Sequence, residues 1–435
     1  MGTDADFEPD GEATDDNVTH PMGTGPTLAD RIPVMARRQS IREIIYYFSS
    51  KPVTTIPTVT SLNIDDWPAG QISVMWVHIV SDAFGSPVCV PVMLAKGPAP
   101  GKVVGLTAAI HGNEVSGIPT IQKIFHDLAP HICNLKGAVV AVPCCNQFGF
   151  ENATRFYQDG SDLNRCFASA FKAEKGVGTA TRSHQYCKNL FERVLANCNV
   201  LIDLHTASFG RHNSFYVRAD MRLPSVARLA RLVQPQIIVH NVRDARGICH
   251  VRIRSNGVSQ VGTGGDGGGG TLRGAATARG IDSVTIEIGD STSFNRTLIG
   301  MTYAGIARVL DDIGVVEVPE FRALDETRPP TVICSHSYWM QTDVGGVLDV
   351  VPRCAELVVR GQFLASVVDI FGFVIRKYVA PEDGVVIGKS TNPANVQGDR
   401  ILHLGVVAPP AMFNDDGTIQ RDVVITSQHG VICGD

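Results

Sequence analysis

A histidine and a glutamate stand three residues apart where an apolar run ends. The run VVGLTAAI, residues 103–110, is long enough to form a buried strand and leads directly into His111, with Glu114 following. Zinc favours imidazole and carboxylate ligands. We expect the pair in the first turn of the helix that follows the strand, where two side chains three apart can point to the same side. In a chain with 13 histidines such a pair also arises easily by chance, so it needs support from elsewhere in the sequence.

Two further apolar runs end in a side chain that can bind a metal or move a proton. The run VLIDLH ends at His205, and SVTIE ends at Glu287. In open α/β sheets, ligands bind beyond the C-terminal ends of the strands, so these side chains should meet at one edge. A catalytic zinc site keeps three protein ligands and an open fourth position. We therefore predict one zinc ion per chain, held by His111, Glu114 and His205, with Asp203 supporting the ligands.

Glu287 is a carboxylate inside an otherwise apolar strand. Burying a charge there is costly unless the group is paired or functional. The functional interpretation makes Glu287 the base that takes a proton from the water at zinc and returns it to the leaving nitrogen. The alternative is a salt bridge at the end of the strand.

A polar segment, TRFYQDGSDLNRCF, follows the apolar run AVVAVPCC and contains Arg155, Asn164 and Arg165. The arginine fork matches a carboxylate, and asparagine adds a donor and an acceptor. Beside a predicted metal site these residues are expected to hold an anionic end of the substrate. Taken alone, the segment is more typical of a solvated loop with a β-turn at QDGS.

The composition is that of a soluble globular protein. Of the 435 residues 44% are apolar, and 38 basic against 43 acidic side chains give a net charge of -5, which leaves no basic surplus to neutralise phosphates. We therefore expect no nucleic-acid partner. No apolar run approaches the length of a membrane span, so no membrane partner is expected. The 11 cysteines include no CxxC pair, which predicts reduced thiols in a cytoplasmic protein and leaves the oligomeric state open.

The pattern of expected elements divides the chain into three parts. Residues 1–27 are acidic and poor in large apolar residues, which predicts a disordered tail, and a helix through Tyr47 follows. Residues 28–328 are expected to form an α/β domain, because apolar runs alternate with helical patterns after a β-hairpin over 71–97; the sheet would be mainly parallel or mixed and flanked by helices. Residues 329–435 carry short β-rich runs, which predicts a small C-terminal all-β domain, a barrel or sandwich.

A glycine-rich motif supplies a rival hypothesis. GTGGDG, residues 262–267, satisfies GxGxxG and precedes the helical pattern TLRGAATARG, with Glu287 at about the distance expected for a ribose contact. This would be an NAD-dependent oxidoreductase. However, the preceding run SNGVSQV is a poor strand, and the extra glycines would detach the helix from the tight turn that the fingerprint needs. We interpret the glycines instead as a mobile loop over the site.

Four motifs together resemble the succinylglutamate desuccinylase/aspartoacylase family, within the zinc carboxypeptidase-like enzymes. They are HGNE at 111–114, DLNR at 162–165, DLH at 203–205 and GGTLRGAATARGIDSVTIEIG at 269–289. The resemblance covers roughly residues 102–290. It implies a carboxypeptidase-like α/β fold with one zinc ion on the three ligands predicted above, and Glu287 as the catalytic acid and base.

The resemblance also carries expectations about the substrate. Asn164 and Arg165 would contact a substrate carboxylate, and so would Arg155, although its spacing to DLNR is longer than in aspartoacylase. The segment TASFGRHNS after His205 does not match the aspartoacylase version. We expect a zinc-dependent amidohydrolase acting on a small N-acyl amino acid or a related amide. A carboxypeptidase acting on peptides, an esterase and a catalytically inactive binding module stay open as alternatives.

Overall fold

The computed structural model describes residues 56–173, 181–241, 270–318, 321 and 325–420, and the backbone alone at 250–255 and 258–263. The expected tail over 1–27 and the expected helix through Tyr47 lie outside the described residues. Within the described residues, no helix is both long enough and apolar enough to cross a membrane.

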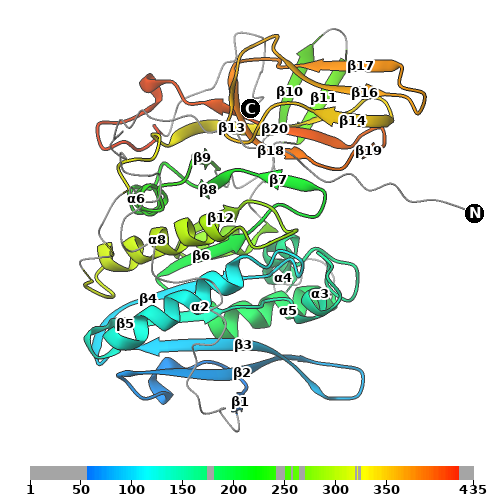
Figure 1. Cartoon of the computed structure of the whole chain (residues 1–435). Helices are drawn as coiled ribbons and strands as arrows, with labels where there is room; N and C mark the ends of the chain where they lie inside the picture. The colour runs from blue at the N-terminus through cyan, green and yellow to red at the C-terminus, as the bar shows by residue number, and fades with distance from the viewer. Residues whose placement is uncertain are drawn as a thin grey trace, which may run out of the picture. The chain divides into compact units, whose positions relative to one another are not determined.

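A mixed sheet of 14 strands organises the chain (Figure 1). Its strands are Thr58–Val59 (β1), Gln71–Ser81 (β2), Pro87–Lys96 (β3), Ala99–Ala108 (β4), Lys136–Val142 (β5), Val200–His205 (β6), Arg211–Asn213 (β7), Phe215–Ala219 (β8), Ile237–His240 (β9), Asp282–Ile288 (β12), Val332–Gln341 (β13), Leu357–Val358 (β15), Gly384–Ser390 (β18) and Arg400–Val407 (β20). In space they follow the order β1-β2-β3-β5-β4-β6-β12-β8-β9-β13-β20-β18-β15, with β7 paired to β18. The centre of the sheet is parallel, from β5 through β4 and β6 to β12.

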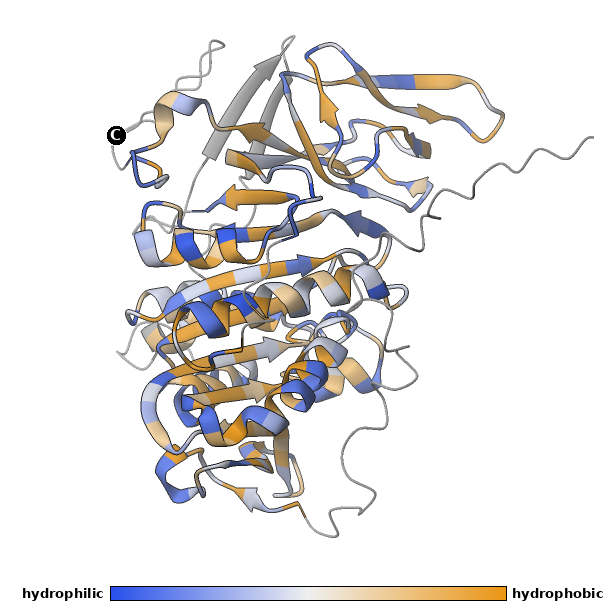
Figure 2. Cartoon of the chain, turned by 60° about the vertical axis from the view of Figure 1, so that its left-hand side comes forward, coloured by the Kyte–Doolittle hydropathy of each residue, from blue (hydrophilic) through white to orange (hydrophobic). Residues whose placement is uncertain are grey.

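The expected hairpin is present, because β2 and β3 pair antiparallel along their length. The central strands are continuous apolar runs, as buried parallel strands require, and Figure 2 shows apolar colour along them. On the sheet lie the helices Gly117–Leu128 (α2), Gln147–Glu151 (α3), Phe167–Ala173 (α4), Arg182–Leu190 (α5), Pro224–Leu232 (α6), Leu272–Thr277 (α7) and Arg296–Asp312 (α8). The 3-10 helices are Ile64–Asp66 (η2), Ala129–Asn134 (η3), Leu163–Arg165 (η4) and Pro410–Met412 (η8), and a π-helical segment, Phe191–Leu195 (η5), follows α5 directly.

Two separate apolar cores cover the two faces of the central strands. On one face α2, α6 and α8 pack together, through residues such as Phe125 and Val309. On the other face α4, α5 and α7 pack, through residues such as Phe167, Tyr186 and Leu272. Successive side chains of a strand point in opposite directions, so alternate side chains of β4 point into the two cores. The expected sheet flanked by helices is therefore confirmed.

The C-terminal region is all-β in its described residues, apart from η8. Strands Gly346–Val350 (β14), Phe363–Val368 (β16), Val374–Val379 (β17) and Ala394–Asn395 (β19) form a separate antiparallel sheet in the order β17-β16-β14-β19. Strands β13, β15, β18 and β20 instead continue the large sheet. The predicted β-rich runs are thus strands, while a domain boundary at residue 328 stays a prediction.

The backbone around the glycine-rich motif differs from the expectation. Residues His250–Ser255 (β10) and Val258–Thr263 (β11) form an antiparallel pair, so the second half of the run SNGVSQV, which was expected to be a poor strand, lies in a strand. Its pairing is nevertheless not the parallel βα arrangement that a dinucleotide fingerprint needs. Residues 264–269, and with them the expected mobile loop, lie outside the described residues.

Candidate active site

The three strand ends singled out in the sequence are neighbours in the sheet. Strand β6 pairs in parallel with β4 on one side and with β12 on the other. Because parallel strands end at the same edge, the residues after β4 and those at the ends of β6 and β12 meet there. The register places Glu287 opposite His205. This is the arrangement that the sequence predicted.

His111 and Glu114 lie in the connection after β4, not in the first turn of a helix as expected. Strand β4 ends at Ala108, and α2 begins only at Gly117. Between them the backbone turns sharply: Ala109 has a φ of 51°, and the amide of Glu114 donates a hydrogen bond of 3.0 Å to the carbonyl of His111. This turn, and not a helical repeat, brings the two side chains to one side.

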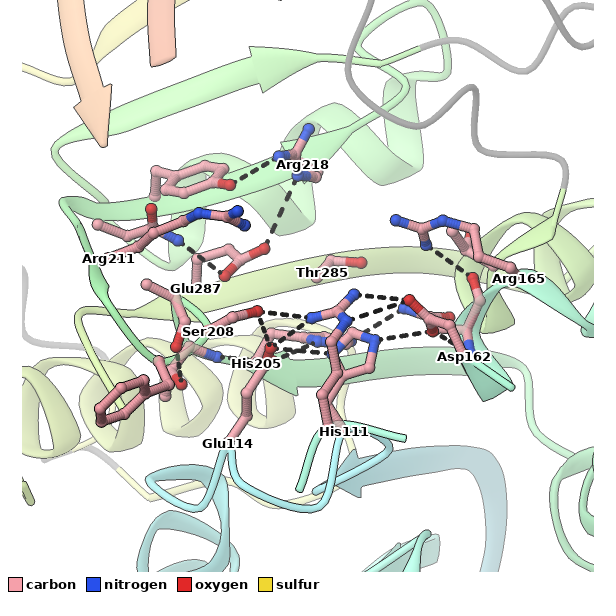
Figure 3. Close-up of a pocket in the computed structure, with 18 of the residues that line it drawn as sticks. His111, Glu114, Asp162, Arg165, His205, Ser208, Arg211, Arg218, Thr285 and Glu287 are labelled. Carbon is pink, nitrogen blue, oxygen red and sulfur yellow. Dashed lines mark hydrogen bonds and ion pairs between the residues drawn. The ribbon is translucent and has the colours of Figure 1, made fainter. Parts of the chain in front are cut away.

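The His111, Glu114 and His205 side chains converge on one point, where one possible ligand atom from each residue lies within 4.8 Å of the other two (Figure 3). Oε1 of Glu114 lies 3.0 Å from Nδ1 of His111, and its Oε2 lies 2.9 Å from Nδ1 of His205. All three side chains are at most 4% exposed, so water does not solvate them freely. The predicted ligand set is therefore assembled.

Each of the two imidazoles also lies close to a further carboxylate through its Nε2 atom. Nε2 of His111 lies 3.1 Å from Oδ1 of Asp162, and Nε2 of His205 lies 2.8 Å from Oδ2 of Asp203. The hydroxyl of Thr107 donates a 2.7 Å hydrogen bond to Oδ1 of Asp203 and so fixes that carboxylate. Metal-binding histidines commonly donate their other ring nitrogen to a carboxylate in this way, which leaves the first nitrogen free for the metal.

The chemistry of these donors fits a divalent metal. Nδ1 of His111 is buried beside Glu114, yet it makes no hydrogen bond with any group in the described part of the chain. Burial alone would raise the pKa of Glu114, but the two imidazoles hold it well below its usual range. Burial would lower the pKa of His205, but Asp203 and Glu114 raise it well above its usual range. The cluster therefore requires positive charge among its carboxylates, which protons or a metal ion can supply.

Glu287 lies next to this cluster and is 12% exposed. Burial raises the pKa of Glu287, and the positive charges of His205 and Arg218 oppose that rise. Its Oε2 accepts a 3.2 Å hydrogen bond from the Asn213 side chain, and its Oε1 lies 3.8 Å from Nε of Arg218. The alternative of a strand-end salt bridge is thus partly present, but the pair is long and the carboxylate still lines the cavity. A carboxylate with a raised pKa in a cavity is suited to proton transfer.

The three residues predicted to contact substrate also line the cavity. Arg155 reaches across the site: its NH1 donates 2.9 Å to Oε1 of Glu114 and its NH2 donates 2.8 Å to Oδ2 of Asp162. Asn164 is buried, and its Oδ1 accepts a 2.8 Å hydrogen bond from the amide of Leu272. NH1 of Arg165 donates a 2.8 Å hydrogen bond to the carbonyl of Asn164. The structure thus brings all three together with the predicted metal ligands.

The cavity has a volume of about 490 Å³ and contains residues that the sequence analysis did not single out. Arg211 and Arg218 come from β7 and β8, Arg273 from α7, and Trp339 and Arg400 from β13 and β20. Burial lowers the pKa of Arg273 to about 10, and Arg218 contributes to that shift. Strand pairing over long stretches of sequence brings these residues together, so no local pattern marked them.

Residues 100–313 match the family model described as the succinylglutamate desuccinylase/aspartoacylase catalytic domain. This range contains every residue that the sequence analysis assigned to the site, and it confirms the resemblance on which those assignments partly rested. No curated protein matches the chain in sequence.

Solved structures share the fold. A succinylglutamate desuccinylase/aspartoacylase from Rhodobacter sphaeroides has a TM-score of 0.64 at 18% identity, covering 81% of this chain and 99% of that one. The product-bound ectoine utilization protein EutE (DoeB) from Ruegeria pomeroyi has a TM-score of 0.60 at 18% identity, with coverages of 77% and 95%. A succinylglutamate desuccinylase from a Silicibacter species has a TM-score of 0.59 at 18% identity, with coverages of 78% and 95%. These likenesses support the fold class.

Proposed function

Because residues 100–313 belong to the succinylglutamate desuccinylase/aspartoacylase family, we propose that the protein is a zinc-dependent hydrolase of small N-acyl amino acids or related amides that carry a carboxylate. His111, Glu114 and His205 would hold the zinc ion. Bound there, zinc would supply Lewis acidity toward the scissile carbonyl and toward the attacking water.

The residues of the chain would divide the remaining work. Glu287 takes a proton from the attacking water and delivers it to the leaving nitrogen, since its carboxylate lies beside His205 and its pKa is raised by burial. Asn164 and Arg165 hold the substrate carboxylate, which orients the amide. Arg155 contacts Glu114 and Asp162, and can both fix the ligands and donate to the substrate.

One observation carries the proposal: three buried side chains that could bind a metal converge beside the largely buried carboxylate of Glu287, which the sheet register places opposite His205. Three protein ligands with an adjacent acid are typical of catalytic zinc sites, whereas structural zinc sites have four protein ligands. A binding module without activity would not need the Glu287 carboxylate beside the ligands, so the presence of Glu287 argues against that alternative.

Metal content is the first test. Protein purified without added metal should contain about one zinc ion per chain by elemental analysis, because three converging ligands bind zinc tightly. His111→Ala should contain little. His126→Ala is the matched control, because His126 lies on α2 beside Asp127 and does not line the cavity.

Activity is the second test. The zinc-loaded protein should release the free amino acid from N-acetyl or N-succinyl amino acids. Release of a C-terminal residue from a dipeptide, with no cleavage of the acyl amino acids, would favour a carboxypeptidase. Absence of zinc from folded protein never exposed to chelator would overturn the hydrolase proposal.

A further inference from the structure

A second cationic group lines the cavity where β7 meets the C-terminal strands. It comprises Arg211, the first residue of β7, Trp339 in β13, and Arg400, the first residue of β20. In Figure 3, Arg211 and Arg165 stand toward opposite ends of the residues drawn, with Glu287 and His205 between them. The segment TASFGRHNS, which departs from the aspartoacylase pattern, supplies Arg211. We call these three residues the Trp339 cluster.

Strand pairing fixes the Trp339 cluster. Arg211 pairs with Ser390 where β7 joins β18 antiparallel, and β18 pairs in turn with β20. Trp339 stands opposite His403 in the pairing of β13 with β20, and Arg400 lies at the start of the same pairing. Residues nearly 200 positions apart in the sequence are thus held by one continuous set of strands, which is a more rigid support than a loop gives.

Contacts within the cluster orient both arginines. The guanidinium carbons of Arg211 and Arg400 each lie 5.4 Å from the centroid of the Trp339 ring, within the range of a cation–π interaction. The Trp339 ring in turn stacks on His403, with centroids 4.8 Å apart and planes 10° apart. His403 is fully buried, and its Nε2 lies 2.9 Å from the Ser337 hydroxyl. The Trp339 indole is therefore held in place against two partly buried cations.

Electrostatics at this end of the cavity favour an anion. The cavity is lined by six arginines and by three carboxylates, those of Glu114, Asp162 and Glu287. Arg155 contacts Glu114 and Asp162, and Arg218 and Asn213 approach Glu287. Burial, and then the charges of Arg218 and Arg400, hold the pKa of His403 well below its usual range, so His403 is neutral and adds no charge of its own.

We propose that Arg211, Trp339 and Arg400 form a subsite for a substrate carboxylate remote from the scissile amide, distinct from the carboxylate held by Asn164 and Arg165. Guanidinium forks bind carboxylates through paired hydrogen bonds, and stacking on Trp339 reduces the side-chain entropy lost on binding. Preferred substrates therefore carry at least two carboxylates. Because two of the three residues come from C-terminal strands, that region selects the substrate. The inference rests on the proposed hydrolase function.

Matched substrates and Arg400→Met test the subsite. N-acetyl-L-glutamine carries one carboxylate; N-acetyl-L-glutamate adds one on the amine side, and N-succinyl-L-glutamine adds one on the acyl side. The zinc-loaded wild-type protein should prefer one of the two acidic substrates, and which one it prefers identifies the side. Arg400→Met should lower kcat/KM for that substrate by about 10- to 100-fold, and change kcat/KM for N-acetyl-L-glutamine by less than about threefold.

Controls separate this effect from a general loss of folding. Arg376→Met is the matched control, because Arg376 lies on β17, is about half exposed and does not line the cavity; it should leave all three substrates unchanged. Zinc content and Tm should match the wild type in both variants. If Arg400→Met lowers the Tm, the same kinetic comparison is made with Arg211→Met. An equal loss for acidic and neutral substrates, or no loss for either, would overturn the subsite.

Binding without turnover separates this inference from the proposed function. If the wild-type protein hydrolyses none of the three substrates, the hydrolase proposal fails, and calorimetric titration with succinate tests the cluster alone. Succinate bound by the wild type and by Arg376→Met, but at least tenfold more weakly by Arg400→Met, would support the subsite. Equal binding by the three proteins, or none by the wild type, would reject it.

Discussion

Glu287 and His205 stand opposite each other in the parallel pairing of β12 with β6. Opposed residues on neighbouring strands place their side chains on the same face of a sheet. A shift of one residue in this register would turn Glu287 away from His111, Glu114 and His205, because side chains alternate with a period of two. The apolar packing of β12 on both faces therefore also sets the position of the Glu287 carboxylate.

Glu287→Gln separates metal binding from turnover. Glutamine keeps the size of the side chain but cannot accept a proton, so kcat should fall by about 10²- to 10⁴-fold, the range typical of a lost general base. Zinc content should stay at the wild-type value, because Glu287 is not among the three converging ligands. Steady-state kinetics and elemental analysis on the same preparation check both statements. Undiminished activity would remove Glu287 from the mechanism.

Arg218→Gln should shift the pH dependence of activity. Burial raises the pKa of Glu287, and the charge of Arg218 opposes that rise. Without the charge, the pKa of Glu287 rises further. A general base works only when deprotonated, so the acid limb of kcat/KM should move to higher pH.

A pH–rate profile at saturating zinc measures this shift in the wild type and the variant. Arg222→Gln serves as the control, because Arg222 pairs with Asp220 and does not line the cavity. If the acid limb of the kcat/KM profile stays in place or moves to lower pH in Arg218→Gln, a group other than Glu287 controls the loss of activity at low pH.

Asp203→Asn tests the carboxylate behind His205. Oδ2 of Asp203 lies 2.8 Å from Nε2 of His205, so it orients the ring and makes its other nitrogen a better ligand. Loss of this charge should weaken zinc binding by about 10- to 100-fold. Competition with a chromogenic chelator measures the affinity. Asp343→Asn, on an ion pair with Arg376 far from the ligands in sequence, should bind zinc as the wild type does.

The sequence was most informative where strands are buried on both faces. Such strands are continuous apolar runs, so the polar residues that end them, His205 and Glu287, are conspicuous. Parallel pairing then brings the ends together without further assumptions. The meeting of these strand ends could be predicted for this reason, and the family motifs mark the same residues; that the residues bind a metal stays a prediction.

The pairing of strands distant in sequence and the backbone conformation of the turns could not be predicted in the same way. Arg211 and Arg400 reach the cavity through β7–β18 and β13–β20, and no local period marks antiparallel partners so distant in sequence. The turn at His111 was also missed. It depends on the left-handed conformation of Ala109, which no residue preference predicts, because alanine rarely adopts a positive φ.

Gly112, between two predicted metal ligands, has backbone atoms packed closely against it. A Cβ added there would lie 1.9 Å from the carbonyl carbon of Gly149 and 2.2 Å from the amide nitrogen of Phe150. Both neighbours are backbone atoms, so neither can rotate away. Gly112→Ala must therefore separate the loop of His111 and Glu114 from α3, which should cost about 1–3 kcal/mol of stability, as overpacking of a close contact does.

Gly300→Ala is the matched control for that change. Gly300 lies within α8 and a Cβ there meets no atom within 4 Å, so alanine should raise stability by roughly 0.5–1 kcal/mol through its better helix propensity. Chemical denaturation gives both free energies of unfolding, and elemental analysis gives the zinc content. Gly112→Ala should lose zinc as well as stability, since the displaced loop carries two ligands. A Gly112→Ala protein with wild-type stability and zinc would show that the loop and α3 can separate without moving the site.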